Sequence, residues 1–189
     1  MGRKYGSLHI RLENTNLSVD VVKNSYRSVM DAVFSSDVKT VAERLGLNII
    51  EQQLPILNSL VNAGLSCSSK QTMVEHDGFV SVSDERITFE NIHNIAQKLS
   101  AIITLPVFFS SVYDDDIFIF GLCENRETIS LHISGTCEAY GMTHVLHNIG
   151  VLEKYVSINE NSAMKLQELC GADAERALIK AIGFQLDIK

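Results

Sequence analysis

Five acidic residues stand in two short segments that flank one strongly hydrophobic stretch, and their types and spacing could do chemistry. Asp114, Asp115 and Asp116 precede that stretch, and Glu124 and Glu127 follow it. Clustered carboxylates bind magnesium or calcium, but such a site needs more oxygen ligands, and no D-x-D-x-D-G loop is present. We therefore interpret the aspartates as a solvated turn, with no metal ligand and no catalytic residue. The charge of the five residues predicts a surface that binds a basic partner protein.

A second polar group alternates along a predicted strand. It comprises Thr128, Ser130, His132 and Ser134, and His144 and His147 follow at the spacing of one helical turn. A serine and a histidine from almost any such set can be drawn as nucleophile and base. No G-x-S-x-G, phosphate-loop, dinucleotide-binding or H-E-x-x-H motif accompanies them. We interpret this group as the exposed polar face of a strand.

The cysteines suggest neither a metal site nor a disulfide framework. Their positions are Cys67, Cys123, Cys137 and Cys170, without C-x-x-C spacing. Scattered thiols of this kind are typical of reduced, buried cysteines. The sequence indicates no cofactor.

Two glycine-containing tripeptides mark a short helical segment. Leu45-Gly46-Leu47 ends one predicted helix, and Ala63-Gly64-Leu65 ends the next. In these features residues 41–65 resemble the helix-turn-helix of winged-helix transcription regulators, which implies DNA binding. However, the run Ile49–Pro55 contains no cation to contact phosphates or base edges, and the spacing has one residue too many. We interpret the segment as a degenerate helical pair and predict no binding to nucleic acid.

A longer pattern extends from Phe79 to Ser134. A short strand, a helix and a strand that starts at Pro106 come first, and Asp114-Asp115-Asp116 then precede the hydrophobic stretch Ile117–Cys123. This order is similar to that of small acidic bacterial proteins, some of which are immunity-type modules that neutralise a basic toxin. The resemblance implies a bacterial protein that binds a basic partner.

The distribution of charge narrows the function classes further. The chain has a net charge of −7, with +2 on residues 1–50 and −9 on the rest. This balance disfavours a phosphate-binding surface. Hydrophobic runs are shorter than the ~20 residues that span a bilayer, and no secretory leader is evident. We expect a cytoplasmic protein without contact to membranes.

Periodicity places the elements that must position these residues. Alternation predicts strands at residues 8–12, 79–83, 107–112, 117–123 and 128–134. The first has His9 and Arg11 on its wet face. The fourth is apolar on both faces and is predicted to be central. Helical spacing predicts helices at residues 19–34, 37–45, 49–63, 88–103, 161–170 and 173–182.

Together these elements predict an α+β fold in a single domain, residues 1–189. The expected sheet is mixed, mostly antiparallel and of about five strands, and helices cover it. Residues 37–65 form a helical subregion, and residues 160–184 form a C-terminal helical pair. An uncovered edge strand at residues 8–12 or 128–134 would also allow a homodimer.

Three functional hypotheses follow. The first is a non-enzymatic protein that acts through protein-protein interaction at its acidic face. The second is a regulatory or small-molecule-sensing domain, with a degenerate winged helix and a ligand held by the sheet. The third is an enzyme whose site forms no recognisable motif. An apolar pocket with converging polar groups would favour a ligand or a substrate, whereas a flat acidic face would favour a partner protein.

Overall fold

One antiparallel sheet organises the molecule. The computed structural model describes residues 2–34, 70–156, 165–166, 169 and 171–188. The sheet has the order β2-β3-β1-β4-β5-β6-β7. Its strands are β1 (Lys4–Arg11), β2 (Gln71–His76), β3 (Phe79–Asp84), β4 (Val107–Tyr113), β5 (Ile117–Glu124), β6 (Glu127–Gly135) and β7 (Val145–His147).

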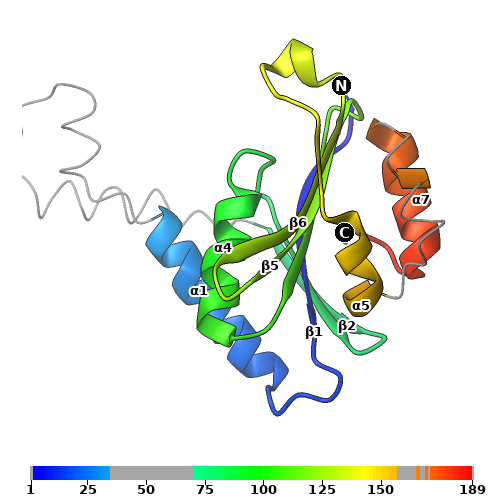
Figure 1. Cartoon of the computed structure of the whole chain (residues 1–189). Coiled ribbons are helices and arrows are strands. Elements are labelled where there is room, and N and C mark those ends of the chain that lie inside the picture. The colour runs from blue at the N-terminus through cyan, green and yellow to red at the C-terminus, as the bar shows by residue number, and fades with distance from the viewer. Residues whose placement is uncertain (1, 35–69, 157–164, 167–168, 170, 189) are drawn as a thin grey trace, which may run out of the picture.

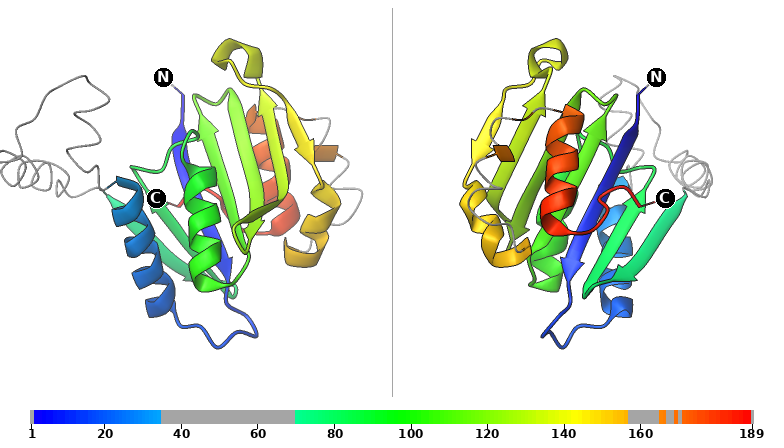
Figure 2. Two further views of the ribbon diagram at one scale, coloured as in Figure 1. Left: turned by 60° about the vertical axis from the view of Figure 1, so that its left-hand side comes forward. Right: turned by 90° about the vertical axis from the view of Figure 1, so that its right-hand side faces the viewer.

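Helices cover both faces of this sheet (Figures 1 and 2). On one face lie α1 (Val19–Phe34) and α4 (Ile92–Ile103), and on the other lie α5 (Leu152–Val156) and α7 (Gly171–Ile182). Two single 3₁₀ turns, η2 (Cys137–Tyr140) and η3 (Ile149–Val151), connect the last elements. The α+β class predicted from the sequence is confirmed.

The topology combines a compact unit with an added meander. In the first four strands, β1 lies between β3 and β4, and α1 and α4 make the connections, which is a split β-α-β arrangement. Strands β5, β6 and β7 then pair in chain order. This meander widens the sheet and gives α5 and α7 a surface to cover.

Two features of the predicted sheet are wrong. In the part of the chain that the structure describes, the sheet has seven strands rather than about five, and all of the observed pairings are antiparallel rather than mixed. The additional strands, β2 and β7, are the two edges, where most side chains are exposed or half-buried and the hydrophobic alternation is weak. Residues 8–12 and 128–134 are therefore not edges, because β1 and β6 each have a strand on both sides.

The other predicted elements either match elements of the structure or lie outside the described residues. Strand β5 is buried on both faces, as predicted, and α1 and α7 match their predicted ranges closely. Helix α4 starts at Ile92, after a turn in which the backbone oxygen of Thr88 accepts from the amides of Asn91 and Ile92. The predicted helical subregion at 37–65 lies outside the described residues, and so does most of the predicted helix at 161–170.

Two hydrophobic cores lie back to back across the sheet. On the α1/α4 face, Tyr26 and Leu99 are fully buried against Leu8 and Phe109. On the α5/α7 face, Phe108, Phe118 and Phe120 pack with Leu178, Phe184 and Leu186. None of the described helices has the length and apolar character needed to cross a bilayer.

Candidate functional site

The aspartate turn is tied to the N-terminal strand. Asp115 accepts two hydrogen bonds from Arg3, from Nε at 2.7 Å and from the backbone amide at 3.1 Å. These contacts hold the pKa of the Asp115 carboxyl below its usual range. Asp114 faces Lys4 Nζ at 3.3 Å, and Asp116 accepts from the Tyr140 hydroxyl at 3.1 Å. Both central residues, Asp114 and Asp115, have positive φ, as a tight hairpin turn requires.

Arg3 also connects this turn to α7. Its guanidinium donates to both carboxylate oxygens of Glu175, at 2.6 and 3.3 Å, and the Tyr5 hydroxyl donates to the same carboxylate at 2.7 Å. Glu175 is only 1% exposed. Burial and the neighbouring Glu175 charge raise the pKa of Tyr5. The acidic turn therefore belongs to an internal network that joins β1, the β4–β5 turn and α7.

Glu124 and Glu127 lie at the other end of β5. Eight residues at ~3.3 Å each separate the two acidic groups by roughly 25 Å. Glu124 accepts a 3.3 Å hydrogen bond from the Tyr155 hydroxyl, and Glu127 is exposed on the opposite side of the turn. The structure therefore does not bring the five acidic residues together into one face.

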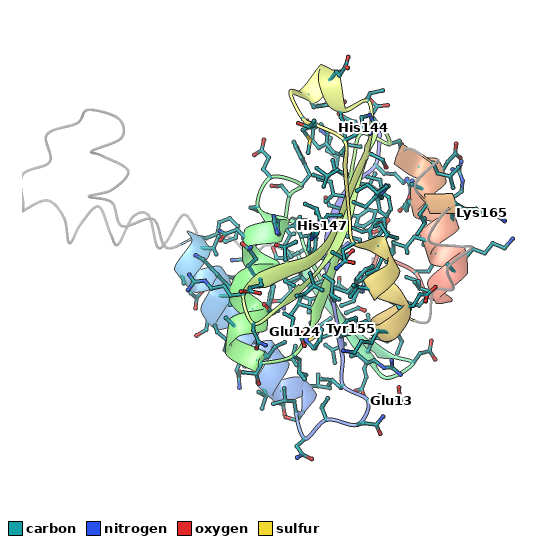
Figure 3. The ribbon with its side chains drawn as sticks, in the orientation of Figure 1. Glu13, Glu124, His144, His147, Tyr155 and Lys165 are labelled. Atoms are coloured by element: carbon teal, nitrogen blue, oxygen red, sulfur yellow. The ribbon has the colours of Figure 1, made fainter. Side chains whose placement is uncertain are left out.

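The polar face of β6 points inward, contrary to our interpretation. Ser130, His132 and Ser134 are buried on the side covered by α5 and α7, whereas Leu131 and Ile133 are only half-buried on the other side. The interpretation failed because alternation separates two faces without showing which one is covered. His144 lies just before strand β7 and His147 is the last residue of that strand, so neither lies in a helix (Figure 3).

His132 is a buried imidazole with few polar neighbours. Its Nε2 lies 2.7 Å from Ser134 Oγ, its ring stacks on Phe120 at 4.8 Å, and its Nδ1 has no hydrogen-bond partner among the described residues. Burial lowers the pKa of His132 to about 4, and the neighbouring imidazole of His144 adds to this effect. This environment keeps His132 neutral at pH 7.

Thr128, which precedes a β-bulge in β6, has different neighbours. Its Oγ1 lies 2.6 Å from His93 Nε2 and accepts from Gln97 Nε2 at 3.2 Å, both on α4. Nearby, Cys123 is a buried free thiol whose pKa burial raises to about 12. A thiol in this state is a poor nucleophile. Cys137 is also buried, whereas Cys67 and Cys170 lie outside the described residues.

A cavity of about 200 Å³ opens at the end of the sheet where β1 and β5 end and β4 begins. We call it the His9 pocket. Its apolar lining consists of Phe79, Leu105, Pro106, Phe108 and Leu122. Its polar lining consists of His9, Arg11, Glu13, Thr15 and Tyr155. Figure 3 shows Glu13, Glu124 and Tyr155 near this end of the sheet.

Hydrogen bonds fix the His9 side of the pocket. His9 Nδ1 lies 2.7 Å from Ser81 Oγ, and His9 Nε2 lies 3.3 Å from Ser110 Oγ. His76 Nε2 lies 2.7 Å from the same Ser81 hydroxyl. Neighbouring strands β2, β3, β1 and β4 supply these four side chains, because antiparallel register places them side by side on one face.

The ring of Phe184, which follows α7, packs against the rings of this network. Its ring lies 5.4 Å from that of His9, 5.0 Å from that of His76 and 4.9 Å from that of Phe79. His9 is fully buried, and burial with the neighbouring His76 lowers its pKa to about 3. A neutral imidazole with both nitrogens occupied is a rigid wall rather than a general base.

Two features of the sequence point in part to this site. The alternation of the first strand predicts His9 and Arg11 on its wet face, but His9 is fully buried and only Arg11 reaches the mouth. Glu124, a predicted site residue because of its charge, lies beside the pocket and contacts Tyr155. Ser81, His76 and Ser110 were missed, because cross-strand pairing alone joins residues so far apart in the chain.

Two other hollows are larger but less suited to hold a ligand. One of about 360 Å³ beside Lys4 and Asp84 includes Lys70, which adjoins residues 35–69 outside the described part. The other, of about 390 Å³, is a groove between α4 and the half-buried face of β6. Within the described ranges, no group of three metal-ligating side chains comes together. The His9 pocket is thus the strongest candidate.

No protein-family model, curated protein or solved structure matches this chain. A fold by itself does not define an activity, so the function has to be inferred from the site.

Proposed function

We propose that this chain is a small-molecule-binding domain and that the His9 pocket is its binding site. The observation that carries the proposal is a concave, mostly apolar cavity next to a hydrogen-bonded histidine-serine network. Binding sites for small molecules have this composition, with an apolar wall and a few fixed polar groups. The proposal corresponds to the small-molecule-sensing hypothesis formed from the sequence.

Binding rather than catalysis is the favoured role. The two ring nitrogens of His9 contact Ser81 and Ser110, so the ring presents no free nitrogen to the cavity. The pKa of about 3 keeps this imidazole neutral at pH 7. Both properties favour a wall of fixed shape, which suits recognition.

The acidic-face hypothesis receives less support from the geometry. Asp114 and Asp115 face Lys4 and Arg3 of the same chain, which reduces the charge they offer to a basic partner. Glu124 and Glu127 remain as a smaller acidic turn. An interface with a basic partner, as in immunity-type modules, would then be restricted to that turn. Alternatively, two copies of the chain would pair through the edge strands β2 or β7.

The proposal is tested with phenethyl alcohol, a small neutral molecule with an apolar body. We expect it to bind the full chain with a Kd of about 1 mM, which corresponds to about 4 kcal/mol. Nuclear magnetic resonance of the isotope-labelled chain should show shifts at Phe79, Phe108 and Leu122. Shifts confined to the groove beside His93 would contradict the proposal.

Two matched variants separate pocket binding from surface binding. Leu105→Trp enlarges a half-buried residue that lines the pocket, so we expect it to abolish the shifts. Ile102→Trp makes a similar change at a residue that is 53% exposed on α4, away from the pocket, and should preserve them. Equal binding by both variants would place the ligand elsewhere.

A further inference from the structure

The mouth of the His9 pocket carries one positive and one negative charge side by side. Arg11 donates from Nε and Nη2 to the same oxygen of Glu13, Oε2, with Nε at 3.1 Å. Arg11 Nη1 has only a long contact of 3.5 Å, to the backbone oxygen of Tyr155. In the described part of the chain, no hydrogen bond reaches Glu13 Oε1. Each partner therefore keeps a polar atom available to a ligand.

A ligand can interact with this ion pair at a small cost in the stability of the fold. The side chains of Arg11 and Glu13 are 44% and 52% exposed. Exposed pairs of this kind stabilise a fold by only about 0–1 kcal/mol. A ligand with a single charge would compete with one partner for the other. A ligand that carries both charges pairs with both partners at once, because its carboxylate meets the guanidinium and its ammonium meets the carboxylate.

We propose that the His9 pocket binds a small zwitterion with an apolar side chain, the chemical class of the hydrophobic α-amino acids. This inference rests on the proposed function and names its ligand class. The ligand carboxylate accepts from Arg11 Nη1, and the ligand ammonium donates to Glu13 Oε1. The apolar side chain lies against Phe79 and Phe108, which line the cavity.

The size of the cavity agrees with this class. A volume of about 200 Å³ equals that of about six or seven water molecules at ~30 Å³ each. The branched side chain of leucine fits within such a space, with its charged groups at the mouth. Leucine is therefore the probe for the experiment.

The first experiment compares leucine with two analogues that each lack one charge. Isopentylamine lacks the carboxylate of leucine, and isocaproate lacks its amino group. We expect L-leucine to bind the full chain at least about tenfold more tightly than either analogue, because each analogue leaves one charge of the pair unmatched. Magnetic resonance titration gives the three Kd values and locates the shifts.

Two variants test which residue binds each charge of the ligand, and a third variant is the control. Arg11→Gln should lower the affinity for leucine to that for isopentylamine, and Glu13→Gln should lower it to that for isocaproate. Both side chains are about half exposed, so neither change endangers folding. Arg176→Gln removes a similar exposed ion pair, with Asp173 on α7, and should leave all three affinities unchanged.

The outcomes distinguish the two proposals. If leucine, both analogues and phenethyl alcohol all fail to bind, the proposed function itself is wrong. If phenethyl alcohol or a single-charge analogue binds as tightly as leucine, the pocket stands and the zwitterion inference is overturned. Loss of leucine affinity in Arg176→Gln to the same extent as in Arg11→Gln would also overturn it.

Discussion

Two buried histidines make the stability of this protein depend on pH. Burial lowers the pKa of His9 to about 3 and that of His132 to about 4, from 6.5 in the unfolded chain. Between pH 6.5 and pH 4 the unfolded chain binds more protons at these positions than the native chain does. The free energy of unfolding therefore falls as the pH falls, by up to about 1.4 kcal/mol per pH unit for each histidine.

Replacing His132 by phenylalanine isolates one of these contributions. The imidazole faces Ser134, Phe118 and Phe120, and the neighbouring imidazole of His144 also lowers its pKa. We expect His132→Phe to reduce the fall in unfolding free energy between pH 6.5 and pH 4 by up to about 1.4 kcal/mol per pH unit. Urea denaturation at several pH values measures this slope.

An exposed histidine provides the control for that measurement. His147 ends β7 and its side chain is exposed, so His147→Asn should leave the slope unchanged. If His132→Phe kept the wild-type slope, then His132 would be able to bind a proton in the native state.

At the residue scale, the sequence predicts which side chains share a face of a strand but not which of the two faces is buried. The alternation in β6 correctly separated Leu131 and Ile133 from His132 and Ser134. Burial then depended on α5 and α7, whose cover over one face cannot be derived from β6 itself. The same gap explains His9, which shares the wet face of its predicted strand with Arg11 and is nevertheless fully buried.

At the scale of elements, Arg3 joins three parts of the fold. It contacts Asp115 in the β4–β5 turn and Glu175 on α7, while its own backbone leads into β1. Glu175 is almost completely buried, so its carboxylate depends on Arg3 and Tyr5 for hydrogen bonds. Removing one partner of a buried charge costs more than forming the pair gains.

The variant Arg3→Ala tests this junction. We expect it to destabilise the fold by about 2 kcal/mol, because among the described residues Glu175 would retain only the Tyr5 hydroxyl as a donor. Thermal denaturation monitored by circular dichroism measures the loss. Arg176→Ala removes an ion pair whose side chains are both largely exposed and should change stability by less than about 0.5 kcal/mol. Equal effects of the two variants would show that Glu175 needs no cation.

The elements that the sequence predicted are those with a strong pattern. Strand β5 is apolar on both faces, and α1 and α4 each carry a continuous buried stripe. Strands β2 and β7 were missed, since an edge strand buries few side chains and its pairing partner supplies most of its definition. The acidic turns were located correctly, but the roughly 25 Å between them follows from the length of β5, which separates them.

At the scale of the whole molecule, the sheet is a wall shared by two cores. Leu8 and Phe109 face α1 and α4, while their sequence neighbours His9 and Phe108 face α5, α7 and the C-terminal segment. Each central strand thus contributes to both cores. Loss of packing on one face removes the support that the strands give to the other, so we expect the two faces to unfold together.

Matched truncations on opposite faces test this cooperativity. Leu99 on α4 and Leu178 on α7 are both fully buried, one in each core. We expect Leu99→Ala and Leu178→Ala each to destabilise the protein by about 3 kcal/mol and to retain a single transition. Far-ultraviolet circular dichroism and tyrosine fluorescence should report the same midpoint for each variant. Ile102→Ala, at an exposed position of α4, should leave the midpoint near that of the wild type. Separate transitions for the two faces, in either variant, would show that the covering layers fold as independent units on the sheet.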